Sequence, residues 1–83
     1  MTATNQKTYT PTARAHLAGN LVRMRRSLGW SQEDLALEAG LHRTFVAHVE
    51  RGARNISLDN IEKLAVVLGV EAFRLLMPPS TTS

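Results

Sequence analysis

Residues 32–49 read QEDLALEAGLHRTFVAHV, and the spacing of small and aliphatic residues in this stretch predicts two helices joined by a sharp turn. Ala36 is small enough to let two helices cross closely at the large angle of such a motif. Gly40, four positions on, can adopt the positive φ that ends one helix and redirects the chain. Val46 and Val49 lie three apart on the second helix, so they share a face that we expect to be buried.

The opposite face of the second helix carries Arg43, Thr44, Ala47 and His48. An arginine, a hydroxyl and an imidazole stand here in place of the glutamates and lysines of an ordinary solvated helix. Arginine matches the O6 and N7 acceptors of guanine, and the other two groups can also hydrogen-bond to base edges. This face is therefore a candidate surface for contacting DNA bases.

Length and composition favour one small helical domain. The chain has 83 residues, of which 43% are hydrophobic and 5% aromatic, enough aliphatic residues for a compact core. The absence of cysteine excludes a disulfide framework and a thiolate zinc site. No apolar run approaches the length of a membrane span, and the polar N-terminus lacks the apolar stretch of a signal peptide. We expect a cytoplasmic protein.

Charge is distributed unevenly along the chain, although the formal net charge is only +3. Residues 12–30 contain four arginines and no acid, whereas Glu33, Asp34 and Glu38 follow close together. Residues 41–54 are again basic. The resulting basic side would favour a polyanion, because phosphate contacts supply most of the sequence-independent affinity for nucleic acid. Charge alone is equally compatible with an ordinary solvated surface.

The hydrophobic period and the helix-boundary residues predict five helices, at about residues 13–28, 32–39, 43–51, 58–68 and 71–77. Ser31, with Asp34 three residues later, has the pattern of a capping box at the second helix. Ser57 is a good N-cap for the fourth helix. Pro78 and Pro79 stop any further helix. The fold class is therefore all-α.

Two apolar stripes define the expected core of a domain over residues 12–77. The first helix contributes Leu17, Leu21, Met24 and Leu28, and the fourth contributes Leu58, Ile61, Leu64, Ala65 and Leu68. Both sets follow the helical period. Residues 1–11 and 78–83 are expected to be flexible tails.

Two longer segments carry a family resemblance: LGWSQEDLALEAG at residues 28–40 and VERGARNISLDNIEKLAVVLGV at residues 49–70. Together they resemble the Cro/C1-type helix-turn-helix family, also called the XRE family, over about residues 17–76. RTFVAHVERGARNISL, residues 43–58, is most similar to the controller proteins of restriction-modification systems. Phe45 departs from their tyrosine. His42 stands where Ser, Thr, Asp or Asn usually caps the recognition helix.

The resemblance implies a compact five-helix bundle of the lambda-repressor-like DNA-binding type. It also implies a sequence-specific transcriptional regulator that acts as a homodimer on a pseudo-palindromic operator of double-stranded DNA, through a recognition helix at about residues 43–51. The implied DNA-contacting residues are Gln32, His42, Arg43, Thr44, Ala47, His48, Arg51 and Arg54. For Arg43 the alternative is a phosphate contact, and for the others it is an ordinary surface role.

Two further sets of residues have structural roles in this interpretation. In the resembled family, positions matching Arg25 and Glu50 form an ion pair between the first and third helices. Val67, Ala72 and Phe73 are expected at a two-fold dimer interface, because the last two helices carry more apolar surface than one small core needs and resemble the end at which the family dimerises.

Other classes of function have less support in the sequence. His42 and His48 are six residues apart, which is not the spacing of a helical metal pair, so we expect no metal site and no cofactor. No recognisable nucleophile motif is present, so we do not expect an enzyme. The remaining alternative is an antitoxin or adaptor that uses the same fold mainly to bind a partner protein.

Overall fold

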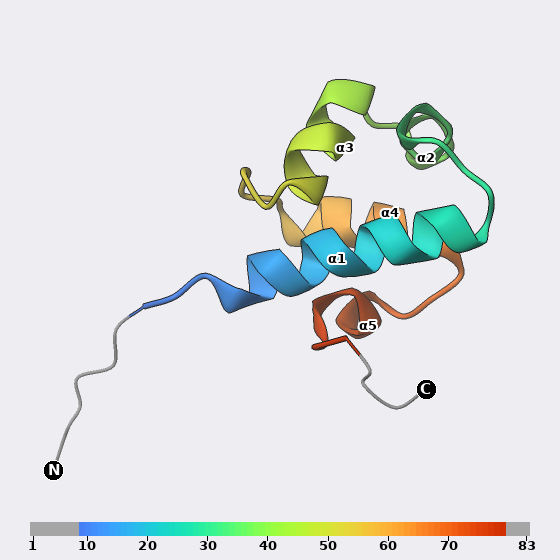
Figure 1. Cartoon of the computed structure of the whole chain (residues 1–83). Coiled ribbons are helices and arrows are strands. Elements are labelled where there is room, and N and C mark those ends of the chain that lie inside the picture. Colours follow the sequence, from blue (N-terminus) through green and yellow to red (C-terminus); the bar gives the residue numbers. More distant parts are fainter. Residues whose placement is uncertain (1–8, 80–83) are drawn as a thin grey trace, which may run out of the picture.

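The computed structural model describes residues 9–79 of the chain, and this part is all-helical (Figure 1). Its helices are α1 (Thr12–Ser27), α2 (Gln32–Ala39), α3 (Arg43–Glu50), α4 (Leu58–Leu68) and α5 (Ala72–Leu76). They agree with the predicted ranges to within one or two residues, so the predicted fold class is confirmed. None of these helices is long and apolar enough to cross a membrane. Most of the two expected tails, residues 1–8 and 80–83, lies outside the described residues.

The boundaries of α2 have the predicted local chemistry. Ser31 Oγ accepts a hydrogen bond from Asp34 N at 3.0 Å, and Asp34 Oδ2 accepts one from Ser31 N at 2.9 Å. This reciprocal pair satisfies amide groups that the first turn of a helix leaves free. Gly40 ends α2 with a φ of 71°, in the left-handed region where a glycine costs least. The sharp turn into α3 follows directly.

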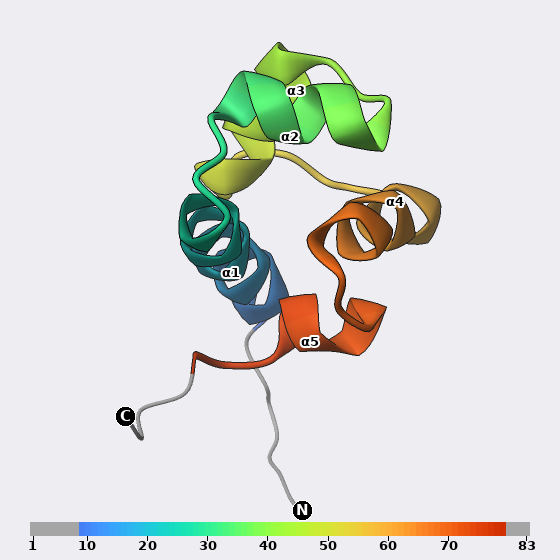
Figure 2. The same ribbon diagram turned by 90° about the vertical axis from the view of Figure 1, so that its right-hand side faces the viewer.

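The helices are arranged in three tiers around one core. α1 and α4 form the middle tier, with α2 and α3 on one side of them and α5 on the other (Figures 1 and 2). α1 packs against α3 and α5, and α4 packs against α2 and α5. The core is made of aliphatic side chains from all five helices, including Leu21, Leu35, Val46, Leu64 and Leu75. Burial of Val46 and Val49 anchors α3 against this core and leaves its other face outward.

Two residues of the predicted stripes are not in the core. Leu28 is 47% exposed and Leu58 is 75% exposed. Leu28 follows the last residue of α1, and Leu58 is the first residue of α4. The helical period places a residue over the core only where the helix itself lies over the core. At the C-terminal end of α1 and the N-terminal end of α4, the apolar pattern extends past the contact with the core.

A buried asparagine, which the sequence patterns did not single out, attaches α5 to α1. Asn20 is 2% exposed, and its Nδ2 lies 2.9 Å from the carbonyl oxygens of both Leu75 and Met77. Its two amide hydrogens therefore have two acceptors at the end of a five-residue helix. Because a buried amide without acceptors is costly, this contact fixes where the last helix lies.

Candidate nucleic-acid interface

The C-terminal end of α3 is held from behind by a bidentate ion pair. Arg25 Nε lies 2.7 Å from Glu50 Oε2, and Arg25 Nη2 lies 3.0 Å from Glu50 Oε1. The two side chains are only 10% and 4% exposed. This hydrogen-bonded carboxylate raises the pKa of Arg25. The expected Arg25–Glu50 pair is thus present, and its two-pronged geometry fixes the orientation of α3 relative to α1.

Gln32 joins this ion pair from α2. Its Nε2 donates to Glu50 Oε1 at 2.9 Å, so the carboxylate at the end of α3 is bound from both α1 and α2. This bond braces α3 from α2. The contact of Gln32 with DNA stays a prediction. Arg25 Nη1 also donates to the carbonyl of Trp30 at 2.8 Å, which ties the α1–α2 turn to the same cluster.

The outward face of α3 is basic and polar. Arg43 and Thr44 in its first turn are exposed, and Ala47 and His48 further along are half-buried. Glu50 is the one acid in the sequence of α3, and its carboxylate is directed inward to Arg25. No carboxylate of α3 therefore opposes an approaching phosphate. The first turn of α3 begins at His42, which is exposed and makes no side-chain cap.

Arg51 and Arg54, which follow α3 in the chain, each contact a side chain of that helix. The Arg54 guanidinium lies 5.6 Å from the centroid of the Phe45 ring, within the range of a cation–π interaction. Arg51 Nη2 lies 2.8 Å from His48 Nδ1. The sequence patterns suggested that Arg51 and Arg54 are near the DNA but gave no signal for either contact. The Phe45 ring thus makes a contact with Arg54 that does not require a tyrosine hydroxyl.

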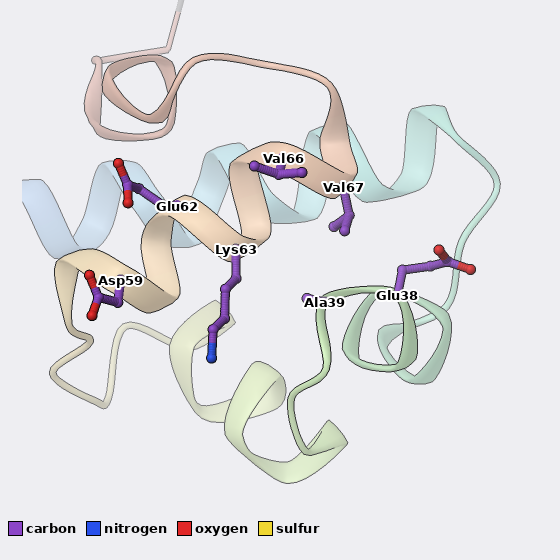
Figure 3. A pocket seen from close by; sticks show the side chains of 7 residues that line it. All are labelled: Glu38, Ala39, Asp59, Glu62, Lys63, Val66 and Val67. Carbon is purple, nitrogen blue, oxygen red and sulfur yellow. The ribbon is translucent and has the colours of Figure 1, made fainter.

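A hollow between α2 and α4 has the opposite character (Figure 3). Its volume is about 490 Å³, and it is lined by Glu38, Ala39, Asp59, Glu62, Lys63, Val66 and Val67. Three carboxylates against one ammonium make this surface unfavourable for a polyanion. The candidate interface with DNA is therefore the outward face of α3.

The residues expected at a dimer interface are on α4 and α5, and one of them, Val67, also lines this hollow. Phe73 is 59% exposed, whereas Val67 and Ala72 are half-buried and pack against the core. Val66 and Met77 add further exposed apolar surface on the same two segments. A monomer leaves this surface in water.

The helix-turn-helix family profile matches residues 21–75. The chain belongs to this helix-turn-helix family. One relative is a hypothetical transcription factor from Neisseria meningitidis serogroup B. It is 56% identical to this chain over 66 residues, which are 80% of the chain. The chain spans only 62% of that relative's length.

Two solved structures of helix-turn-helix proteins are also similar. The restriction-modification controller protein C.AhdI from Aeromonas hydrophila is 45% identical, with a TM-score of 0.72 over 75% of this chain and 94% of that one. SinR, a master regulator for biofilm formation whose structure is in complex with DNA, is 29% identical, with a TM-score of 0.70 over 74% of this chain and 98% of that one. The resemblance to controller proteins that the sequence indicated is thus confirmed as a relationship.

Proposed function

We propose that this helix-turn-helix protein is a sequence-specific transcriptional regulator that places α3 in the major groove of double-stranded DNA. The observation that carries the proposal is the α3 geometry: an outward face without a carboxylate, fixed from behind by Arg25, Gln32 and Glu50. Similarity to a controller protein and to a regulator solved with DNA supports it. A regulator of transcription works where the DNA is, so the proposal includes a cytoplasmic location.

The proposed contacts divide by the reach of each side chain. Arg43 and Thr44 contact base edges from the first turn of α3, with Ala47 and His48 further along the same face. His42, Gln32, Arg51 and Arg54 surround this face and contact the phosphate backbone, which positions the helix without specifying sequence. Bound in this way, the domain acts on transcription by occupying its site: it either blocks polymerase or touches it from an adjacent site.

The proposed assembly is a homodimer through α4 and α5, around Val67, Ala72 and Phe73. A two-fold contact there would bury the exposed Phe73 ring and present two copies of α3 to one side of the duplex. The two half-sites of the operator would then lie about 34 to 36 Å apart, one turn of DNA. Phe73→Asp, which puts a charge on this surface, should shift the sedimentation equilibrium to monomer, whereas Leu37→Asp at an exposed position of α2 should not.

The alternative, a domain that mainly binds a partner protein, has less support from the α3 face. Such a face would be expected to carry contiguous exposed apolar residues. Instead Arg43 and Thr44 are its most exposed members, and Phe45 is half-buried under Arg54. DNA is therefore the partner that this face favours.

Selection of bound duplexes from a random DNA pool tests the proposal. We expect enrichment of a pseudo-palindrome whose half-sites are one helical turn apart. Lys63→Ala, in the acidic hollow, serves as a matched control for loss of a cation and should leave the selected sequence and its affinity unchanged. A pool that stays random after repeated rounds, while the protein remains folded and dimeric, would contradict sequence-specific binding and favour the partner-protein alternative.

A further inference from the structure

A hydrogen bond joins two of the proposed DNA-contacting residues at the end of α3. Arg51 Nη2 lies 2.8 Å from His48 Nδ1. A guanidinium has donors and no acceptor, so His48 Nδ1 must be the acceptor in this contact. A neutral imidazole that accepts at Nδ1 carries its proton at Nε2. The contact therefore selects one of the two tautomers of His48.

The surroundings of Arg51 leave its guanidinium available for this contact. Within residues 9–79, Arg25 and Glu50 form the one ion pair closer than 4 Å. Glu50 precedes Arg51 in the chain, but both of its oxygens already accept from Arg25, and Gln32 shares one of them. The nearest carboxylate in sequence thus does not compete with His48.

His48 is also placed where a fixed tautomer would matter. It follows Thr44 by four residues, so both lie on the same face of α3. We propose that Arg51 is a positioning residue, which holds His48 as an Nε2–H donor toward the major groove. This inference rests on the proposed function, because it gives one residue pair a part in distinguishing bases.

A fixed Nε2–H donor on His48 would prefer some bases to others, because base edges in the major groove differ in their donors and acceptors. Guanine N7 and O6, adenine N7 and thymine O4 are acceptors, whereas the amino groups of cytosine and adenine are donors. An Nε2–H group favours the acceptors and is opposed by the amino groups. Arg51 would therefore affect base preference without contacting a base. If Arg51 instead only binds a phosphate, it adds the same affinity to every sequence.

The two roles of Arg51 are separated by a double-mutant cycle on the operator obtained by selection. His48→Ala should lower the ratio of affinities for the operator and for a single-base variant by roughly 5- to 150-fold at one base pair per half-site. Arg51→Met, which keeps the side-chain length but has no donor, should lower the same ratio at the same base pair. The double variant should lose no more discrimination than His48→Ala alone, and Arg51→Lys should restore part of it.

Two outcomes of this cycle overturn the proposal. If Arg51→Met weakens all sequences alike, flattens the salt dependence and keeps the ratio, Arg51 is a phosphate contact alone and does not position His48. If His48→Ala leaves the ratio unchanged, His48 does not distinguish bases. In both cases a ratio that still depends on Arg43 leaves the proposed function standing, whereas a wild-type protein that selects no sequence ends both.

The tautomer itself can be measured in the free protein. Long-range ¹H–¹⁵N correlation spectra, recorded at a pH above the titration range of histidine, should show the proton of His48 on Nε2. Arg51→Met should change the ¹⁵N shift of Nδ1, the atom that loses its donor, while His42 serves as an internal control and should not change. A wild-type spectrum with the His48 proton on Nδ1 would overturn the inference without any DNA measurement.

Discussion

The two ends of α3 differ: the C-terminal end is anchored in a buried cluster, and the N-terminal end is exposed and uncapped. At its C-terminal end, Glu50 accepts three hydrogen bonds, from Arg25 and Gln32, in a cluster shielded from water. At its N-terminal end, His42 leaves the helix without a side-chain cap, and the residues that follow it are exposed. A helix anchored at one end can present the other end in a fixed orientation. Anchoring and exposure are thus separated between the two ends of one short helix.

The uncapped start of α3 is also unlike the starts of its neighbours. Ser31 caps α2 by accepting from Asp34 N at 3.0 Å, and Ser57 caps α4 by accepting from Asn60 N at 3.1 Å. All three cap positions have extended backbone geometry, with φ between −80° and −73°. The difference therefore lies in the side chain and not in the backbone.

The largest effect should come from breaking the anchored end. Glu50→Ala leaves Arg25 as a buried cation without its carboxylate, and we expect the free energy of unfolding to fall by about 3 to 5 kcal/mol. Urea denaturation followed by circular dichroism measures this change. Glu62→Ala, at an exposed position of α4, removes a carboxylate of the same size and should change stability by less than about 0.5 kcal/mol. Equal effects of the two substitutions would show that the cluster does not anchor α3.

The next largest effect should come from the exposed end, and it should appear in binding. Arg43→Ala should cost roughly 1 to 3 kcal/mol at one base pair per half-site, because it removes a side chain suited to guanine. Stability should hardly change, since Arg43 is exposed. Fluorescence anisotropy with operator and single-base variants measures the effect.

Arg54→Ala is the comparison for that experiment. It should weaken all sequences alike and reduce the salt slope by about one, as expected for a phosphate contact. If Arg43→Ala also lowered specific and random binding equally, the assignment of base contacts to the first turn of α3 would be wrong.

Local features of this fold could be predicted from the sequence, whereas contacts between distant residues could not. Helix positions and the Ser31–Asp34 capping box follow from local chemistry, and they were predicted correctly. The Arg25–Glu50 pair joins residues 25 positions apart, and only the family resemblance indicated it. Asn20 was missed because its acceptors are backbone carbonyls 55 and 57 residues away, which no side-chain pattern marks. Leu28 and Leu58 were placed in the core because periodicity does not show where a helix leaves its neighbours.

A smaller effect is expected at the capped start of α2. Ser31→Ala removes the hydroxyl that accepts from Asp34 N, and we expect it to lower the free energy of unfolding by about 1 kcal/mol. Ser57→Ala at α4 should behave similarly, because its hydroxyl makes the same contact. Urea denaturation of both variants checks the value. If Ser31→Ala had no effect while Ser57→Ala did, the bond from Ser31 N to Asp34 Oδ2 would have to hold the start of α2 alone.

The smallest expected effect has the opposite sign and concerns the start of α3. His42 has a φ of −80° and a ψ of 141°, so a serine there could accept from the amide of Phe45 without a change of backbone. Relative to His42→Ala, which removes the ring and adds no acceptor, His42→Ser should raise the free energy of unfolding by about 0.5 to 1 kcal/mol. Urea denaturation of both variants against the wild type separates the cap from the loss of imidazole. If serine and alanine gave the same stability, the amides at this end of α3 would already be satisfied. The contrast between the two ends of the helix would then concern exposure alone, because the missing cap would cost the protein nothing.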